Sequence, residues 1–202
     1  MKNLLVTLFA CATLSYANAA ENKTIRISTD NTDLVLQVGD NGRLYQTYLG
    51  EKLLHEQDLN NFQWNIHAGA DGSVSKRGWE VYGGSGNEDY FEPAIHMRHN
   101  DNNSSLLLKY VEHSNEPKGD GVNETVITLK DDKYPVTVKL HYIAYGKENV
   151  IRTFSEISHQ EKKPVILSKY ASSMLHLNSS RYFLTEFSGD WAHEANITER
   201  EL

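Results

Sequence analysis

Aromatic and acidic residues gather in one glycine-rich stretch of the sequence, residues 79–94. Trp79 opens the stretch, Asp89 and Tyr90 lie near its end, and three glycines between them make the backbone pliable. Flat aromatic rings stack on the C–H groups of a sugar ring, and carboxylates accept hydrogen bonds from its hydroxyls. The stretch therefore indicates a sugar-binding loop, with Trp79, Asp89 and Tyr90 as candidate binding residues. The alternative interpretation is a surface loop whose aromatic rings close one end of a sandwich.

A second cluster lies near the C-terminus, where Trp191 stands between Asp190 and Glu194. For the same chemical reason, Trp191 is a further candidate for contact with a sugar. It equally fits a core residue at the point where the last strand turns. Residue types leave both interpretations open.

Other patterns of catalytic or metal-binding residues are absent from the sequence. His96 and His99 are three residues apart, so on a strand they point to opposite faces and cannot hold one ion. His-Glu-x-x-His and Gly-x-Ser-x-Gly do not occur, and no Lys-Ser/Thr follows the glycines. We therefore predict no metal site and no cofactor. The 27 acidic residues offer too many pairs for a catalytic pair to be chosen.

The elements that must position these residues are β-strands, because apolar residues alternate with polar ones along much of the chain. Such alternation puts one face of each strand on a core and the other in water. Asn41-Gly42 between two apolar runs is a strong hairpin signal. The pattern predicts an all-β, mostly antiparallel sandwich of about ten or more strands. The expected strands include residues 24–28, 34–38, 106–110, 136–144, 151–157, 165–177 and 182–187.

The N-terminal residues have the pattern of a secretory signal peptide. Lys2 precedes an apolar run that ends in an Ala-x-Ala cleavage site at residues 17–19. We expect residues 1–19 to be removed, and residues 20–202 to form one β-sandwich domain exported to the periplasm or the extracellular space. Cys11 is the only cysteine, so the exported chain is expected to have no disulfide and no thiolate. Lipoprotein cleavage at Cys11 is the alternative.

The charge of the chain limits the classes of partner that it can bind. The formal net charge is −7, and hydrophobic residues make up 39% of the sequence, as in ordinary globular proteins. An acidic surface argues against nucleic acid and anionic membranes as partners. The N-terminal apolar run is also too short for a membrane-spanning helix, which needs about 20 residues.

Four segments, in their order and spacing, resemble the N-terminal domain of glycoside hydrolase family 36, a family of α-galactosidases. They are the hairpin at 34–50, the loop at 86–94, the strand–turn–strand at 142–158 and the closing segment at 182–202. The loop looks like the family's Gly-Asp-aromatic-Arg-x-Pro-Ala segment, and residues 188–194 look like its Ser-Gly-x-Trp-Ala-Arg-Glu segment. Phe91 and His193 stand where the family has arginines.

The resemblance implies a β-supersandwich, the galactose-mutarotase-like fold, placed before a (β/α)₈ barrel that hydrolyses terminal α-galactosides with retention. Both catalytic carboxylates of the family lie in that barrel, so the resemblance assigns no catalytic residue here and implies that this chain alone is inactive. Asp89 matches an Asp that helps to form the sugar pocket, often that of a neighbouring subunit. The implied partners are α-galactoside oligosaccharides, the downstream barrel and further copies in a homo-oligomer.

Two other functions fit the same residues. The loop at 79–91 fits a stand-alone carbohydrate-binding module. The implied fold also supports a mutarotase-like epimerase, which needs a histidine and a carboxylate facing each other in one cleft. His96 and His141 are the candidate histidines for that function.

Overall fold

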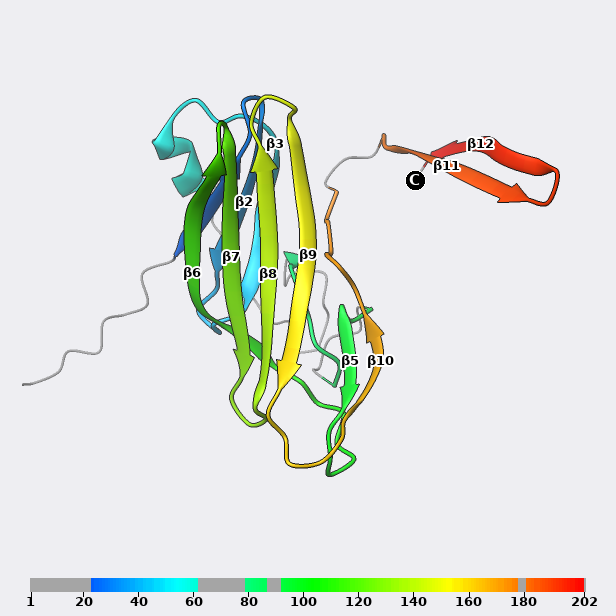
Figure 1. The fold of residues 1–202 in the computed structure, drawn as a ribbon. Coiled ribbons are helices and arrows are strands. Elements are labelled where there is room, and N and C mark those ends of the chain that lie inside the picture. The colour runs from blue at the N-terminus through cyan, green and yellow to red at the C-terminus, as the bar shows by residue number, and fades with distance from the viewer. Residues whose placement is uncertain (1–22, 62–78, 87–91, 178–180, 202) are drawn as a thin grey trace, which may run out of the picture.

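Two antiparallel four-stranded sheets face each other in the computed structural model of the chain (Figure 1). The structure describes residues 23–61, 79–86, 92–177 and 181–201. The first sheet consists, in spatial order, of β1 (Thr24–Ser28), β2 (Thr32–Val38), β3 (Leu44–Glu51) and β4 (Trp79–Glu80). The second consists of β6 (Leu108–Gly119), β7 (Val122–Asp131), β8 (Val136–Tyr145) and β9 (Val150–His159). A short 3₁₀ helix, η1 (Glu56–Asn61), follows β3.

Two further strand pairs complete the described chain. β5 (Ile95–Arg98) pairs with β10 (Ile166–Tyr170), and β11 (Phe183–Asp190) forms a hairpin with β12 (His193–Glu201). Figure 1 shows this hairpin standing away from the two sheets. All these pairings are antiparallel, which confirms the predicted all-β sandwich. β10 is shorter than the strand expected over residues 165–177, because side-chain hydrogen bonds hold the chain around His176 in place of a sheet partner.

The core lies between the two large sheets and follows the alternation of the sequence. Along β8 every second side chain is buried, from Val136 to Ala144, while the side chains between them are exposed or half-buried. Ile25 and Ile27 of β1 and Leu34 and Leu36 of β2 meet them from the first sheet. Burial of such side chains from water is the main stabilising contribution to a fold of this kind.

β2 differs from the prediction that each strand keeps one face in water. Leu34 and Leu36 face the core, but Asp33 and Val35 on the opposite face are also buried. The reason is that the chain after β3 folds back over this face. The backbone N–H of Leu53 donates to Asp33 Oδ2 at 2.7 Å, and the Arg26 guanidinium donates to the Leu53 carbonyl at 2.6 Å.

The predicted Asn41-Gly42 turn is confirmed as the link between β2 and β3. Gly42 has φ = 77°, in the left-handed region that glycine adopts without strain. The side-chain oxygen of Asn41 accepts a hydrogen bond from the Arg43 backbone N–H at 3.0 Å, which closes the turn locally.

The predicted signal peptide, residues 1–19, lies outside the described residues, and Cys11 lies there with it. Its removal, the export of the chain and the extent of the mature domain therefore stay predictions. Within the part of the chain that the structure describes, no helix is long and apolar enough to cross a bilayer.

Candidate functional site

The glycine-rich stretch at 79–94 begins in the first sheet, with strand β4. In β4 the backbone of Trp79 lies opposite Gln46 of β3. The side chain of Trp79 lies outside the described residues, as do Asp89 and Tyr90. These three sugar-binding candidates therefore stay predictions, and what the structure shows is the frame on either side of the loop.

A largely buried ion pair fixes β4. The Arg43 guanidinium is bonded to both carboxylate oxygens of Glu80, with Nε to Oε1 at 2.8 Å. A bidentate pair of this kind fixes orientation as well as distance. The His176 ring Nε2 lies 2.8 Å from the Glu80 carbonyl oxygen, and burial lowers the pKa of His176. Since the ring then stays neutral, it donates to that carbonyl through one N–H.

The two ends of the loop are clamped between β5 and residues 104–106. Gly84 forms a parallel bridge with Ile95, and the Leu106 N–H donates to the Ser85 carbonyl at 2.9 Å. The Ser85 hydroxyl donates to the Ser104 carbonyl at 2.7 Å. The loop thus starts from a rigid base.

Replacing Gly84 with alanine should destabilise the chain by about 2 kcal/mol, because a Cβ there would overlap the backbone carbonyl oxygen of Leu106. Backbone cannot swing aside as a flexible side chain would. Chemical denaturation of both proteins measures the difference. Ser104→Ala keeps the carbonyl that Ser85 uses and should change stability by less than about 0.5 kcal/mol. Equal stability of Gly84→Ala and the parent would contradict the rigid base.

A buried histidine and glutamate lie beside this base. His99 and Glu161 have side chains only 0% and 2% exposed, with His99 Nδ1 2.7 Å from Glu161 Oε1. The other ring nitrogen of His99 lies 3.1 Å from the Ser105 carbonyl oxygen, so both nitrogens face acceptors. Tyr134 stacks on the imidazole with ring centroids 3.5 Å apart. Both ring nitrogens and one ring face of His99 are therefore engaged, and the cluster is a buried, fully paired support for residues 99–105.

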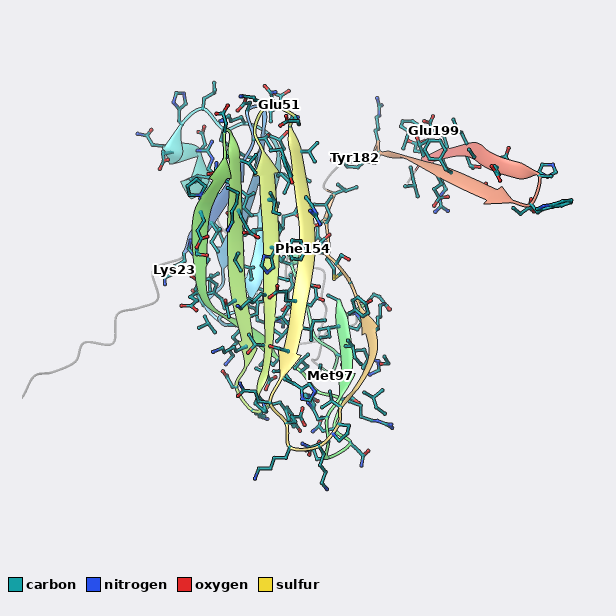
Figure 2. All side chains as sticks on the ribbon, in the orientation of Figure 1. Lys23, Glu51, Met97, Phe154, Tyr182 and Glu199 are labelled. Atoms are coloured by element: carbon teal, nitrogen blue, oxygen red, sulfur yellow. The ribbon has the colours of Figure 1, made fainter. Side chains whose placement is uncertain are left out.

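The second sequence candidate lies at the tip of the β11–β12 hairpin. Trp191 is 95% exposed, so the interpretation as a core residue is wrong. His193 Nδ1 lies 3.7 Å from Asp190 Oδ1 across the turn. Figure 2 shows the hairpin side chains, including Glu199, away from the two sheets.

One face of the hairpin carries three large apolar side chains together with the cross-strand pair Thr185 and Glu199. Phe187 lies opposite Ile197, and Phe183 shares their face because side chains alternate along a strand. All three are exposed. The opposite face carries the cross-strand pair Glu186 and Thr198.

The histidine candidates for epimerase chemistry differ in their surroundings. His141 Nδ1 lies 2.9 Å from Glu124 Oε1, and its Nε2 lies 3.7 Å from Glu156 Oε1. Its ring stacks on Phe154, labelled in Figure 2 on β9. These groups stand on the outer face of the second sheet, opposite the core-facing residues of β8. His96 is exposed on β5.

In the described part of the chain, no group of three or more His, Cys, Asp or Glu side chains is arranged to hold a metal ion.

A known protein family matches most of the chain. The family described as "Glycosyl hydrolase family 36 N-terminal domain" matches residues 42–202. The chain belongs to this family. The matched range contains the loop at 86–94 and the hairpin at 183–201, so both sequence candidates lie inside the family 36 N-terminal domain.

The family 36 relatives are larger proteins. The α-galactosidase Mel36A of Lactobacillus acidophilus is 21% identical over 204 residues, which cover 90% of this chain and 28% of that protein. The chain therefore spans little more than a quarter of that relative.

Solved structures show the same fold. The α-galactosidase from Lactobacillus brevis superposes with a TM-score of 0.77 at 20% identity, over 91% of this chain and 28% of that one. AgaA of Geobacillus stearothermophilus gives 0.74 at 21% identity, over 89% and 28%. A variant of AgaA, solved in complex with stachyose, gives 0.75 at the same identity and coverage.

Sequence reasoning missed the His99–Glu161 pair of this family 36 domain. One signal was available, because Ile95, Met97 and His99 alternate in the sequence and are all buried, with His99 one residue beyond the end of β5. Nothing local pointed to Glu161, which lies 62 positions further along the chain.

Proposed function

We propose that this chain is the N-terminal β-sandwich portion of an exported α-galactosidase that hydrolyses terminal α-galactosides with retention. In this proposal the catalytic carboxylates belong to a (β/α)₈ barrel outside the chain, which by itself is inactive. The chain supports assembly and contributes Asp89 to a sugar pocket. In a homo-oligomer, this pocket belongs to a neighbouring subunit. Membership of family 36 supports the proposal, as do neighbours solved with raffinose and with stachyose. The predicted signal peptide supports export.

The uneven distribution of exposed large apolar side chains carries this proposal. Nine of the thirteen such residues in the described chain lie between positions 166 and 197. A monomeric surface scatters apolar side chains singly, whereas a concentration of them marks a surface that another part covers. The nine are Ile166, Leu167, Tyr170, Leu175, Leu177, Phe183, Phe187, Trp191 and Ile197.

The β11–β12 hairpin indicates which face of the chain another part of the enzyme covers. A two-stranded ribbon alone is only marginally stable in water and needs packing on an apolar face. Its hydrogen bonds and ion pairs in the described chain stay within the hairpin. The face with Phe183, Phe187 and Ile197 is therefore the one that the rest of the α-galactosidase would cover.

The direct test is an assay with an aryl α-galactoside. The 202-residue chain should show no hydrolysis above the uncatalysed rate, and a protein extended through the barrel should show ordinary α-galactosidase activity. Full activity of the 202-residue chain would overturn the proposal that its chemistry lies elsewhere. Size-exclusion chromatography with light scattering of the extended protein tests the homo-oligomer.

In the extended protein, the double variant Phe187→Ser, Ile197→Thr should fail to assemble, and its α-galactosidase activity should fall at least tenfold. The cause is loss of the apolar contact that holds the hairpin on its neighbour. Activity at equal protein concentration and the thermal midpoint measure the effect. Thr198→Ser, on the opposite face of the same hairpin, is the matched control and should behave as the parent. Parental behaviour of the double variant would remove the docking role of the hairpin.

A carbohydrate-binding module is the second candidate, favoured by the exposed indole of Trp191 beside Asp190. An exposed indole flanked by a carboxylate suits stacking on a sugar ring. Calorimetry of the 202-residue chain with galactose and raffinose separates the two functions. Heat that disappears in Trp191→Ala would favour the module, and no heat with either sugar would exclude it.

A further inference from the structure

A cavity of about 140 Å³ lies between the two sheets, on the side of β3 and β9. Its walls are mainly aliphatic, and the chain at 173–175 forms one side. An engineered apolar cavity of about 150 Å³ in another protein stays dry and binds benzene. One six-membered ring therefore fits this cavity. The aliphatic side chains that line it include Leu34, Leu36, Leu49, Val81 and Ile151.

Tyr142 brings a hydroxyl to these apolar walls. It points inward from β8, lines the cavity and is 5% exposed. Burial raises its pKa well above the usual range, so the phenol stays protonated and is a hydrogen-bond donor. No hydrogen bond joins the hydroxyl to another described residue, and Tyr142 lines the open space of the cavity. Tyr142 thus presents a hydrogen-bond donor to a space of ring size.

The other polar groups of the cavity limit what it can take. The Gln46 carboxamide is engaged on both sides, since Nε2 donates to the His176 carbonyl at 2.6 Å and Oε1 accepts from the His176 N–H at 3.1 Å. Thr153, the cross-strand neighbour of Tyr142, and Ser173 add one hydroxyl each. A pyranose carries several hydroxyls, and each hydroxyl buried without a partner is unfavourable. The walls therefore exclude sugars and favour an apolar ring with one oxygen.

We propose that this cavity is a binding site for a small apolar compound of about the size of a six-membered ring that carries one oxygen atom, with Tyr142 donating a hydrogen bond to that oxygen. The site is separate from the loop at 86–94 and from the hairpin, and it does not depend on α-galactosidase activity. Its failure would leave the proposed function untouched.

Methyl-labelled nuclear magnetic resonance of the full 202-residue chain tests the site, with phenol, benzene and galactose as probes. Phenol should produce saturable shifts at millimolar concentration, confined to the methyl groups of Leu34, Leu36, Leu49, Val81 and Ile151. Benzene should shift the same methyl groups with weaker affinity, and galactose should shift none of them. Shifts by galactose at these methyl groups would overturn the assigned ligand class. Phenol shifts that spread over surface methyl groups and spare the cavity would show an adventitious additive only.

Two variants identify the polar contact and the space. Tyr142→Phe should weaken phenol binding about tenfold and leave benzene binding unchanged, because only the hydroxyl is lost. Tyr145→Phe, on the same strand but the opposite face, is the matched control and should bind both probes as the parent does. Leu49→Phe should abolish binding of both by filling the cavity. Equal phenol affinity of Tyr142→Phe and the parent would overturn the role of Tyr142, and the benzene response of that variant verifies that its fold is intact.

Discussion

Replacing Glu161 with alanine should lower the free energy of unfolding by about 3 kcal/mol, because it leaves the buried His99 imidazole without its charged partner. Glu161→Gln should be milder, at about 1 kcal/mol. A carboxamide can accept from the Asn100 N–H, which now donates to Glu161 Oε2 at 3.0 Å, and can donate to a neutral His99. Urea denaturation at neutral pH measures both variants.

The same pair makes the stability of the fold depend on pH. Burial alone would raise the pKa of Glu161, but hydrogen bonds from the Asn100 N–H and from His99 outweigh it and lower that pKa. A carboxyl with a lowered pKa in the folded state stabilises the fold above its unfolded value of about 4.3, and this stabilisation is lost as the pH falls. The stability difference between the parent and Glu161→Ala should therefore shrink below about pH 4.3.

Glu148→Ala is the matched control, since Glu148 is exposed in the turn between β8 and β9. It should change stability by less than about 0.5 kcal/mol at any pH. A stability loss for Glu161→Ala no larger than this, or a difference that does not vary with pH, would contradict the account of a buried Glu161 carboxylate held by His99 and the Asn100 N–H.

Replacing Asp33 with alanine should also cost about 3 kcal/mol. Asp33 is 0% exposed, and its Oδ2 accepts hydrogen bonds from Arg26 Nε at 3.0 Å and from the Leu53 N–H at 2.7 Å. Removing the carboxylate leaves the partly buried Arg26 guanidinium and the Leu53 N–H without this acceptor, and frees the chain that covers β2. Denaturation measures the loss of stability, and hydrogen exchange at Leu53 should accelerate with it.

Asp40→Ala is the control for Asp33, because Asp40 is exposed in the turn after β2. It should stay within about 0.5 kcal/mol of the parent. Unchanged protection of the Leu53 amide in Asp33→Ala would show that the chain after β3 is held by other contacts.

The strands could be predicted because their signal is local. Val136 to Ala144 alternate in the sequence, and β8 buries every second side chain. Asn41-Gly42 predicted the turn between β2 and β3, since the backbone of that turn favours glycine at one position. β2 was the exception, because burial of Asp33 depends on Leu53, which is 20 positions away.

The candidate sites could be predicted only in part. Residue types pointed to Trp191, and its exposure at the hairpin tip became clear only from the strand pairing around it. Tyr142 reads in the sequence as one more core residue, because no pattern along the chain shows that it lines a cavity. Whether a cavity forms depends on how side chains from both sheets fill the space between them.

The sequence by itself determined the all-β class, the inward face of most strands and the motifs shared with family 36. These properties are set by neighbours a few residues apart, through strand periodicity and turn chemistry. Only the tertiary structure decided that His99 meets Glu161, that Tyr142 faces a cavity and that Phe183, Phe187 and Ile197 are exposed on one face of the C-terminal hairpin. Each of these depends on which distant strands pack together, and sequence periodicity carries no record of that.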